Sequence, residues 1–106
     1  MNMIPEGIIE VDSDFGRAIG FTSDKFHKGS YLFWKDGELW ISAVVSKVKG
    51  AFREMMKKVE ALGLDFCIPT PFPRMMEIGA KQGWKYTKRK VDKETIDCFL
   101  NKRVVA

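Results

Sequence analysis

A cluster of basic residues lies where an apolar, strand-like run gives way to an amphipathic helical pattern, and its residue types suit phosphate binding. The run covers residues 40–45, and the helical pattern begins directly after Gly50. A glycine at such a junction lets the backbone approach a ligand closely, and the first N–H groups of a helix have no partner within it. Lys47, Lys49 and Arg53 add positive charge at the same place. The sequence therefore predicts a cradle for an anionic, phosphate-bearing ligand.

A second basic group lies nearer the end of the chain. It consists of Lys85, Lys88, Arg89 and Lys90. Such a cluster is typical of a solvated edge strand. The aromatic neighbours Trp84 and Tyr86 would also suit a surface that follows a nucleic-acid backbone and stacks on its bases. Nucleic acid is therefore an alternative partner, which we do not favour.

The cysteines and the histidine indicate neither metal nor thiol chemistry. Cys67 and Cys98 lie in apolar, strand-like stretches without a CxxC pattern or a nearby histidine, so we expect buried, reduced thiols and no metal site. The single histidine, His27, lies in a polar stretch, and we assign it no role. Neither a Walker pattern nor Gly-x-Gly-x-x-Gly occurs, so a generic nucleotide binder ranks last among the interpretations.

Length and composition predict a single domain over residues 1–106, because a chain of 106 residues with 45% hydrophobic content can bury one ordinary core but not two. It has no run of about 18 apolar residues, and its start lacks the basic and apolar regions of a signal peptide. We therefore expect a soluble, cytoplasmic protein with no membrane partner. The net charge of +4 is compatible with nucleic acid, nucleotides or acidic proteins and does not choose among them.

The first half of the chain predicts an edge strand and a hairpin. Residues 4–18 mix short apolar runs with glycine and acids, which indicates an edge strand followed by a loop. The pair Asp36-Gly37 between two aromatic runs predicts antiparallel strands over residues 31–34 and 39–45. Both faces of the second strand are largely apolar, so we expect it at the centre of a sheet.

The second half predicts a strand–helix–strand unit. Apolar residues at helical spacing predict a helix over residues 51–62, which ends before Gly63. Residues 65–69 then predict a buried strand parallel to the one before the helix, with a right-handed crossover. A second helix over residues 73–82 begins at a proline. The last element is a hairpin of residues 84–88 and 95–100, joined across residues 91–94. The expected fold class is α+β, with a mixed, mostly antiparallel central sheet that contains one parallel strand pair.

This order of elements resembles the C-terminal two-thirds of the GNAT N-acetyltransferase superfamily, over about residues 31–100. The pyrophosphate loop of that superfamily reads Arg or Gln, two residues, Gly, one residue, then Gly or Ala. Residues 47–52 occupy this loop, with Lys47 for the Arg or Gln, Gly50 in place, and Phe52 for the second small residue. Together with residues 68–75 and the pair Gly83-Trp84, the loop is similar to short GNAT-like proteins carried by bacteriophages and prophages.

The resemblance implies an acyl-CoA-dependent N-acyltransferase that takes acetyl-CoA as cosubstrate and transfers the acyl group directly to an amine acceptor. Loop N–H groups would bind the pyrophosphate, and the pantetheine arm would lie beside the end of the central strand, where the strand of residues 66–69 splays away. We expect Phe52 to point into the core. The implied cofactor-binding residues are Val44, Val45, Lys47, Val48, Lys49, Gly50, Ala51 and Phe52.

The resemblance leaves the catalytic residues unassigned. Many members place a tyrosine four residues before the closing glycine, where it protonates the departing CoA thiolate, and that position here is Gly79. A general base would be Glu38 or an ordered water, although Glu38 is more typical of a solvated turn residue. The alternative function is an inactive, phage-encoded GNAT-like module that engages a host protein or nucleic acid. The N-terminal region is short for the superfamily, so the acceptor groove is either open or completed by a second subunit in a homodimer.

Overall fold

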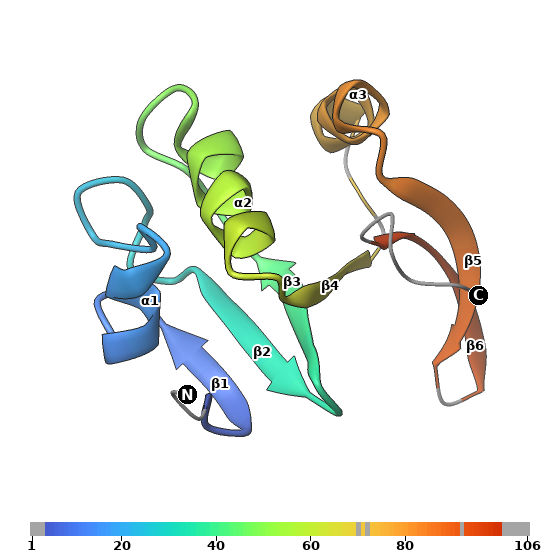
Figure 1. Cartoon of the computed structure of the whole chain (residues 1–106), viewed down its shortest axis with the longest axis horizontal. Helices are drawn as coiled ribbons and strands as arrows, with labels where there is room; N and C mark the ends of the chain where they lie inside the picture. The colour runs from blue at the N-terminus through green and yellow to red at the C-terminus, as the bar shows by residue number, and fades with distance from the viewer. Residues whose placement is uncertain (1–3, 70, 72, 92, 101–106) are drawn as a thin grey trace.

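The structure is a computed structural model that describes residues 4–69, 71, 73–91 and 93–100 (Figure 1). None of the described helices is both long and apolar enough to cross a membrane. In chain order the elements are β1 (Gly7–Glu10), α1 (Asp14–Ala18), β2 (Tyr31–Lys35), β3 (Glu38–Ala43), α2 (Ala51–Ala61), β4 (Asp65–Pro69), α3 (Pro73–Gln82), β5 (Lys85–Val91) and β6 (Glu94–Leu100).

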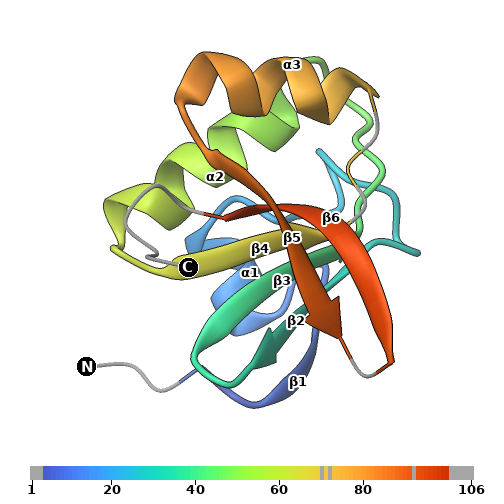
Figure 2. The same cartoon turned by 90° about the vertical axis from the view of Figure 1, so that its right-hand side faces the viewer.

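The six strands of the described residues join one mixed sheet in the order β1-β2-β3-β4-β6-β5. The β3–β4 pair is parallel, and the other four pairs are antiparallel. Helix α2 connects the two parallel strands, and α2 and α3 lie over the same face of the sheet (Figures 1 and 2). This architecture confirms the predicted α+β fold class, including the parallel pair joined by a helix and the terminal hairpin.

The hairpin of β2 and β3 forms around the predicted turn. Asp36 and Gly37 both have positive φ, at 52° and 76°, which is the backbone of a two-residue turn that matches the twist of the flanking strands. The pairing of β2 with β3 shifts its register between Tyr31 and Phe33. Strand β3 ends at Ala43, so the last two residues of the strand expected over 39–45 leave the regular ladder.

The main core lies between the sheet and the two long helices. Helix α2 buries an apolar stripe of Phe52, Met55, Met56 and Val59. These residues recur at helical spacing, so the helix turns one face to the sheet and its charged residues to solvent. The helix ends one residue earlier than predicted, and α3 and β4 have the predicted bounds.

Trp84, which follows α3, joins the helices to the sheet. Its ring meets Phe52, Phe66 and Phe99 edge-on, with centroid separations of 6.5, 5.2 and 6.0 Å. Edge-to-face aromatic contacts of this kind are favourable beyond the area that they bury. The indole N–H donates to the carboxylate of Glu60 on α2. This ring therefore fixes α2 over the β4–β6 pair.

Two predicted segments are wrong in extent. The loop expected in the second part of residues 4–18 contains α1, because Ser13 caps its first turn and accepts the Gly16 N–H at 3.1 Å. The terminal hairpin is longer than predicted, because the ladder continues to the Val91–Glu94 pair instead of opening into a loop there. Strand β1 does lie at the sheet edge, as expected.

The face of the sheet opposite α2 and α3 carries a smaller cluster. Cys67, Cys98 and Leu100 are buried there, with Trp40 packed against them. Both cysteines are free thiols, as the sequence predicted. Burial raises the pKa of the Cys67 thiol to about 12, so this thiol stays protonated and unreactive at neutral pH.

Candidate functional site

The predicted cradle lies where β3 leaves the sheet and α2 begins. Gly50 caps α2 in the left-handed conformation, with φ of 85°, and no side chain caps the helix. The Ala51 N–H donates to the Val48 carbonyl at 3.1 Å, and the Glu54 N–H donates to the Gly50 carbonyl at 3.0 Å. Within the described residues, no acceptor is recorded for the N–H groups of Phe52 and Arg53. These two donors, at the positive end of the α2 dipole, are therefore free for an anion.

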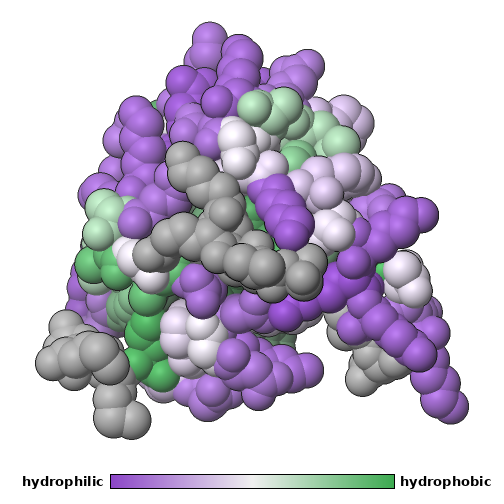
Figure 3. All heavy atoms as spheres, turned by 45° about the vertical axis from the view of Figure 1, so that its right-hand side comes forward, coloured by the Kyte–Doolittle hydropathy of each residue, from purple (hydrophilic) through white to green (hydrophobic). Residues whose placement is uncertain are grey.

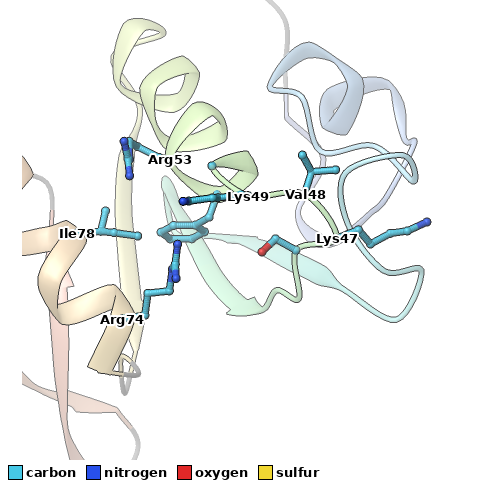
Figure 4. A pocket seen from close by; sticks show the side chains of 9 residues that line it. Lys47, Val48, Lys49, Arg53, Arg74 and Ile78 are labelled. Carbon is cyan, nitrogen blue, oxygen red and sulfur yellow. The ribbon is translucent and has the colours of Figure 1, made fainter.

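A cavity of about 320 Å³ lies beside this corner, between the loop, the start of α2 and α3 (Figure 4). Four basic residues line it, and the side chains of three of them gather on one side: Lys49 from the loop, Arg53 from α2 and Arg74 from α3. Figure 4 shows their side chains on the same side of the loop, with Ile78 of α3 beside them. The cavity therefore combines free backbone donors with positive charge from three separate segments, which is an arrangement that favours phosphate.

Lys47 contributes less than the motif implies. Figure 4 shows its side chain directed away from the other cations. Its ammonium donates to the carbonyl of Ser23 at 3.0 Å, and its N–H donates to the carbonyl of Lys25 at 2.7 Å. Lys47 therefore ties the loop to the segment before β2, and Lys49 is the loop lysine that serves the cavity.

The backbone of Val45 is already occupied. Its N–H donates to the hydroxyl of buried Ser30 at 2.9 Å, and its carbonyl accepts the His27 N–H at 2.9 Å. Of the two residues proposed to line the pantetheine arm, Val45 therefore has a backbone that is already engaged.

The ladder between the parallel strands β3 and β4 is shorter than the strands themselves. The pairing of β3 with β4 ends at Trp40 and Cys67, although the strands continue to Ala43 and Pro69. Strand β4 stays paired with β6 up to Pro69, so β3 loses its neighbour on this side. Among the described residues, the last part of β3 thus has an unpaired backbone edge directly before the cavity.

Phe52 lies in the core, as expected. It is 8% exposed and contacts Trp84, while one side of its ring lines the cavity. The ring therefore forms a wall of the site and leaves its volume open. Of the other predicted residues, Val48 and Gly50 line the cavity, and Ala51 is buried beneath it.

Arg74 and Ile78 are site residues that the sequence analysis missed. They lie one helical turn apart on α3, so they share a face of that helix. The spacing of these two residues is visible in the sequence. The sequence does not show that this face of α3 approaches α2, because the approach depends on how closely α3 packs on the sheet.

Gly79 permits that close approach. A Cβ at this buried position would lie 2.5 Å from Cζ of Phe99 on β6, far inside van der Waals contact. Any side chain here would displace α3 or the Phe99 ring. Gly79 is therefore a packing contact between α3 and β6.

Glu38 is poorly placed to act as a base. Its carboxylate receives two bonds from Arg89, at 2.9 and 3.1 Å, and its side chain is only 14% exposed. Glu38 also begins β3, whereas the cavity lies beyond the other end of the strand. This hydrogen bonding raises the pKa of Arg89, which also stacks over Trp40 at 5.5 Å from the ring centroid. The pair supports the sheet instead of the cavity.

The second basic group has less aromatic surface than the sequence suggested. Trp84 is 6% exposed, so it cannot stack on a nucleic-acid base, whereas Tyr86 is 49% exposed. Arg89 is held by Glu38. Figure 3 shows hydrophilic side chains along the β5–β6 hairpin, at the lower right of that view. This surface has the character of a solvated edge strand.

No family model, curated protein or solved structure matches the chain. The described residues also contain no group of three side chains that could hold a metal ion. The chemistry that the cavity supports is anion binding, by the free N–H groups of Phe52 and Arg53 together with Lys49, Arg53 and Arg74. Before this cavity, the ladder between β3 and β4 ends at the Trp40–Cys67 pair.

Proposed function

We propose that this protein is an acyl-CoA-dependent N-acyltransferase that transfers an acyl group, acetyl in the simplest case, to an amine. One observation carries the proposal. A cavity with three cations and two free N–H groups lies directly after a strand whose parallel neighbour has separated from it. A CoA thioester has the matching parts in the same order, because its diphosphate is followed by a pantetheine arm with two amide groups.

The diphosphate end of the ligand is the better supported half. Guanidinium groups bind phosphate oxygens with two parallel hydrogen bonds, and Arg53 and Arg74 approach the cavity from different helices. The free N–H groups at the start of α2 add donors whose positions are fixed by the backbone. The segment of residues 25–30 forms hydrogen bonds with Val45 and Lys47 of the loop. The backbone of the cradle is therefore held in place before the ligand binds.

The pantetheine arm would pair with the exposed edge of β3. In the proposed complex an amide of the arm would bond to the backbone N–H and carbonyl of Val44, since those of Val45 are already bonded to Ser30 and His27. Hydrogen bonds of this kind place the thioester by the backbone alone, without named side chains. The reacting carbonyl would then lie near the point where the two strands separate, beyond the Trp40–Cys67 pair.

The transfer needs little acid–base help. The amine attacks the thioester carbonyl, a C–N bond forms, the C–S bond breaks, and CoA leaves as a thiolate. The amine loses one proton and the thiolate gains one, so water can carry the proton between them. Positioning of the amine against the thioester supplies much of the acceleration in such reactions. This route suits a site in which Gly79 offers no acid and Glu38 is held by Arg89.

An inactive binding module on the same scaffold is the second candidate. The contact of Gly79 with Phe99 favours it, because this contact removes the usual proton donor. Such a module would bind the CoA thioester without turnover, or would engage a host protein or nucleic acid. In either case we place the protein in the bacterial cytoplasm, where CoA thioesters occur and where thiols such as Cys67 stay reduced. A homodimer would complete the acceptor groove.

Two lysines of one loop provide a matched test. Both lysines line the cavity, but the Lys49 side chain lies with Arg53 and Arg74, whereas the Lys47 side chain is directed away from them and donates to Ser23. Calorimetric titration with acetyl-CoA should show about tenfold weaker binding for Lys49→Ala and for Arg74→Ala, and nearly unchanged binding for Lys47→Ala. Equal losses for both lysine variants would contradict the proposed site.

Turnover separates the two candidates. Release of CoA thiol is followed with a panel of small amines and lysine peptides. Binding with turnover supports the enzyme, and binding without turnover on any amine supports the inactive module. If acetyl-CoA does not bind while the protein is retained on DNA or RNA in a salt-dependent way, both CoA-based candidates are wrong.

A further inference from the structure

The cavity at the start of α2 has a neighbour farther along α3. This second cavity measures about 350 Å³. Both cavities are lined by Lys49, Arg53, Arg74 and Ile78, so they are adjacent parts of one groove. The second part is also lined by Lys81, in the last turn of α3. The groove is therefore longer than a diphosphate alone requires.

The two ends of this groove cannot serve one anion. Arg74 and Lys81 lie seven residues apart on α3, which separates their backbones by about 10 Å along the helix axis. A single phosphate group is much smaller than that distance. Ile78 lies between them and gives the middle of the groove an apolar wall. The order along α3 is thus cation, apolar residue, cation.

Charge in the second cavity is also in excess. Four cations line it against one carboxylate, that of Glu77. Lys49, Arg53 and Arg74 are already placed to meet a diphosphate in the first cavity. Glu77 lies one turn before Lys81 on α3, but among the described residues no ion pair joins them. Lys81 can therefore meet a further anion, and a phosphomonoester, which carries about −1.5 to −2 at neutral pH, would match it.

We infer that the second cavity is a subsite for a phosphomonoester of the acyl donor, with a nucleoside lying against Ile78 between the two phosphate sites. This inference rests on the proposed function. It makes the protein selective for free CoA thioesters, which carry a 3′-phosphate on the nucleoside. Donors without that group, such as dephospho-CoA thioesters or phosphopantetheine on a carrier protein, would leave Lys81 unused.

Acetyl-CoA and its dephospho analogue provide the test, since they differ by the 3′-phosphate alone. We expect acetyl-CoA to bind about tenfold more tightly in calorimetric titrations. Lys81→Gln should bring the two affinities close together by weakening acetyl-CoA and leaving the dephospho analogue unchanged. Lys90→Gln removes an equally exposed cation from β5, away from the groove, and should keep the tenfold ratio.

A second readout follows the phosphate itself. Phosphorus NMR of the complex should show the 3′-phosphate titrating at lower pH than in free acetyl-CoA, because a nearby ammonium favours its dianion. Lys81→Gln should reverse that shift. Both variants replace exposed side chains, so neither depends on a change in folding.

The outcomes distinguish this inference from the proposed function. Equal binding of both thioesters would overturn the subsite and leave the acyl-CoA function intact. Tighter binding of an acylated carrier protein than of acetyl-CoA would also overturn the subsite. Binding of neither thioester would overturn the proposed function and the subsite together.

Discussion

Gly79 on α3 lies against the ring of Phe99 on β6 so closely that a single added Cβ would stand 2.5 Å from Cζ. This contact sets the distance between α3 and the sheet. It thereby sets where Arg74 and Ile78 meet α2 and form one wall of the cavity. The absence of a side chain at this position is thus a condition for the site.

Gly79→Ala should therefore destabilise the fold. Forcing a methyl group into this contact should lower the free energy of unfolding by about 1–3 kcal/mol, as measured by urea denaturation. Combining it with Phe99→Leu should cost less than the sum of the two single changes, because the smaller side chain makes room. A Gly79→Ala variant as stable as the parent would show that α3 is free to shift.

Gly50→Ala should affect both stability and binding. The left-handed conformation at φ of 85° costs an alanine about 1–2 kcal/mol, although its Cβ would meet no atom within 4 Å. Gly83 also has a left-handed backbone, at φ of 73°, and a Cβ added there would likewise meet no atom within 4 Å, but Gly83 does not line the cavity. Urea denaturation should give similar losses for Gly50→Ala and Gly83→Ala, and calorimetry should show weaker acetyl-CoA binding for Gly50→Ala alone. If Gly83→Ala weakened binding as much, the effect would not come from the cradle.

Glu38→Gln tests whether the side chain suggested as a general base takes part in the reaction. Loss of the ion pair with Arg89 should lower the free energy of unfolding by about 1 kcal/mol. The rate of acyl transfer at saturating substrate should stay the same, because the carboxylate lies at the far end of β3 from the cavity. A fall in that rate of a hundredfold or more would restore Glu38 as a general base.

Cys67 should make stability fall at alkaline pH. Its pKa is raised from 9.0 to about 12 in the folded protein, so the unfolded chain releases this proton first. The stabilising contribution is thus complete below pH 9 and is lost as the pH rises from 9 toward 12, with a slope of at most about 1.4 kcal/mol per pH unit. Urea denaturation between pH 8 and 11 should show a shallower decline for Cys67→Ala. Parallel declines would mean that Cys67 does not contribute.

Local features of the sequence predicted most of the elements. The turn at Asp36 and Gly37, the apolar stripe of α2 and the proline that begins α3 each act over a few residues, and the corresponding elements formed with nearly the predicted bounds. Helix α1 was missed, although the cap at Ser13 is also a local signal. The predicted strands of the terminal hairpin are shorter than the observed ones, because the length of a ladder depends on how the two strands pair near the turn.

The site was predictable only on the side formed by the loop itself. The position of Gly50 and the basic character of the loop were visible in the sequence. The occupation of the Val45 backbone by Ser30 was not, because 15 residues separate the two. The contribution of Arg74 was hidden as well, since it depends on the contact of Gly79 with Phe99. Long-range packing therefore decided which of the predicted residues serve the cavity.

The most direct test of the acyl-donor site is a titration of the backbone amides with acetyl-CoA by NMR. The account predicts large shifts for the free N–H groups of Phe52 and Arg53, and small shifts for Val45, whose N–H is already bonded to Ser30. Shifts that spare Phe52 and Arg53 and gather on the β5–β6 hairpin instead would contradict it.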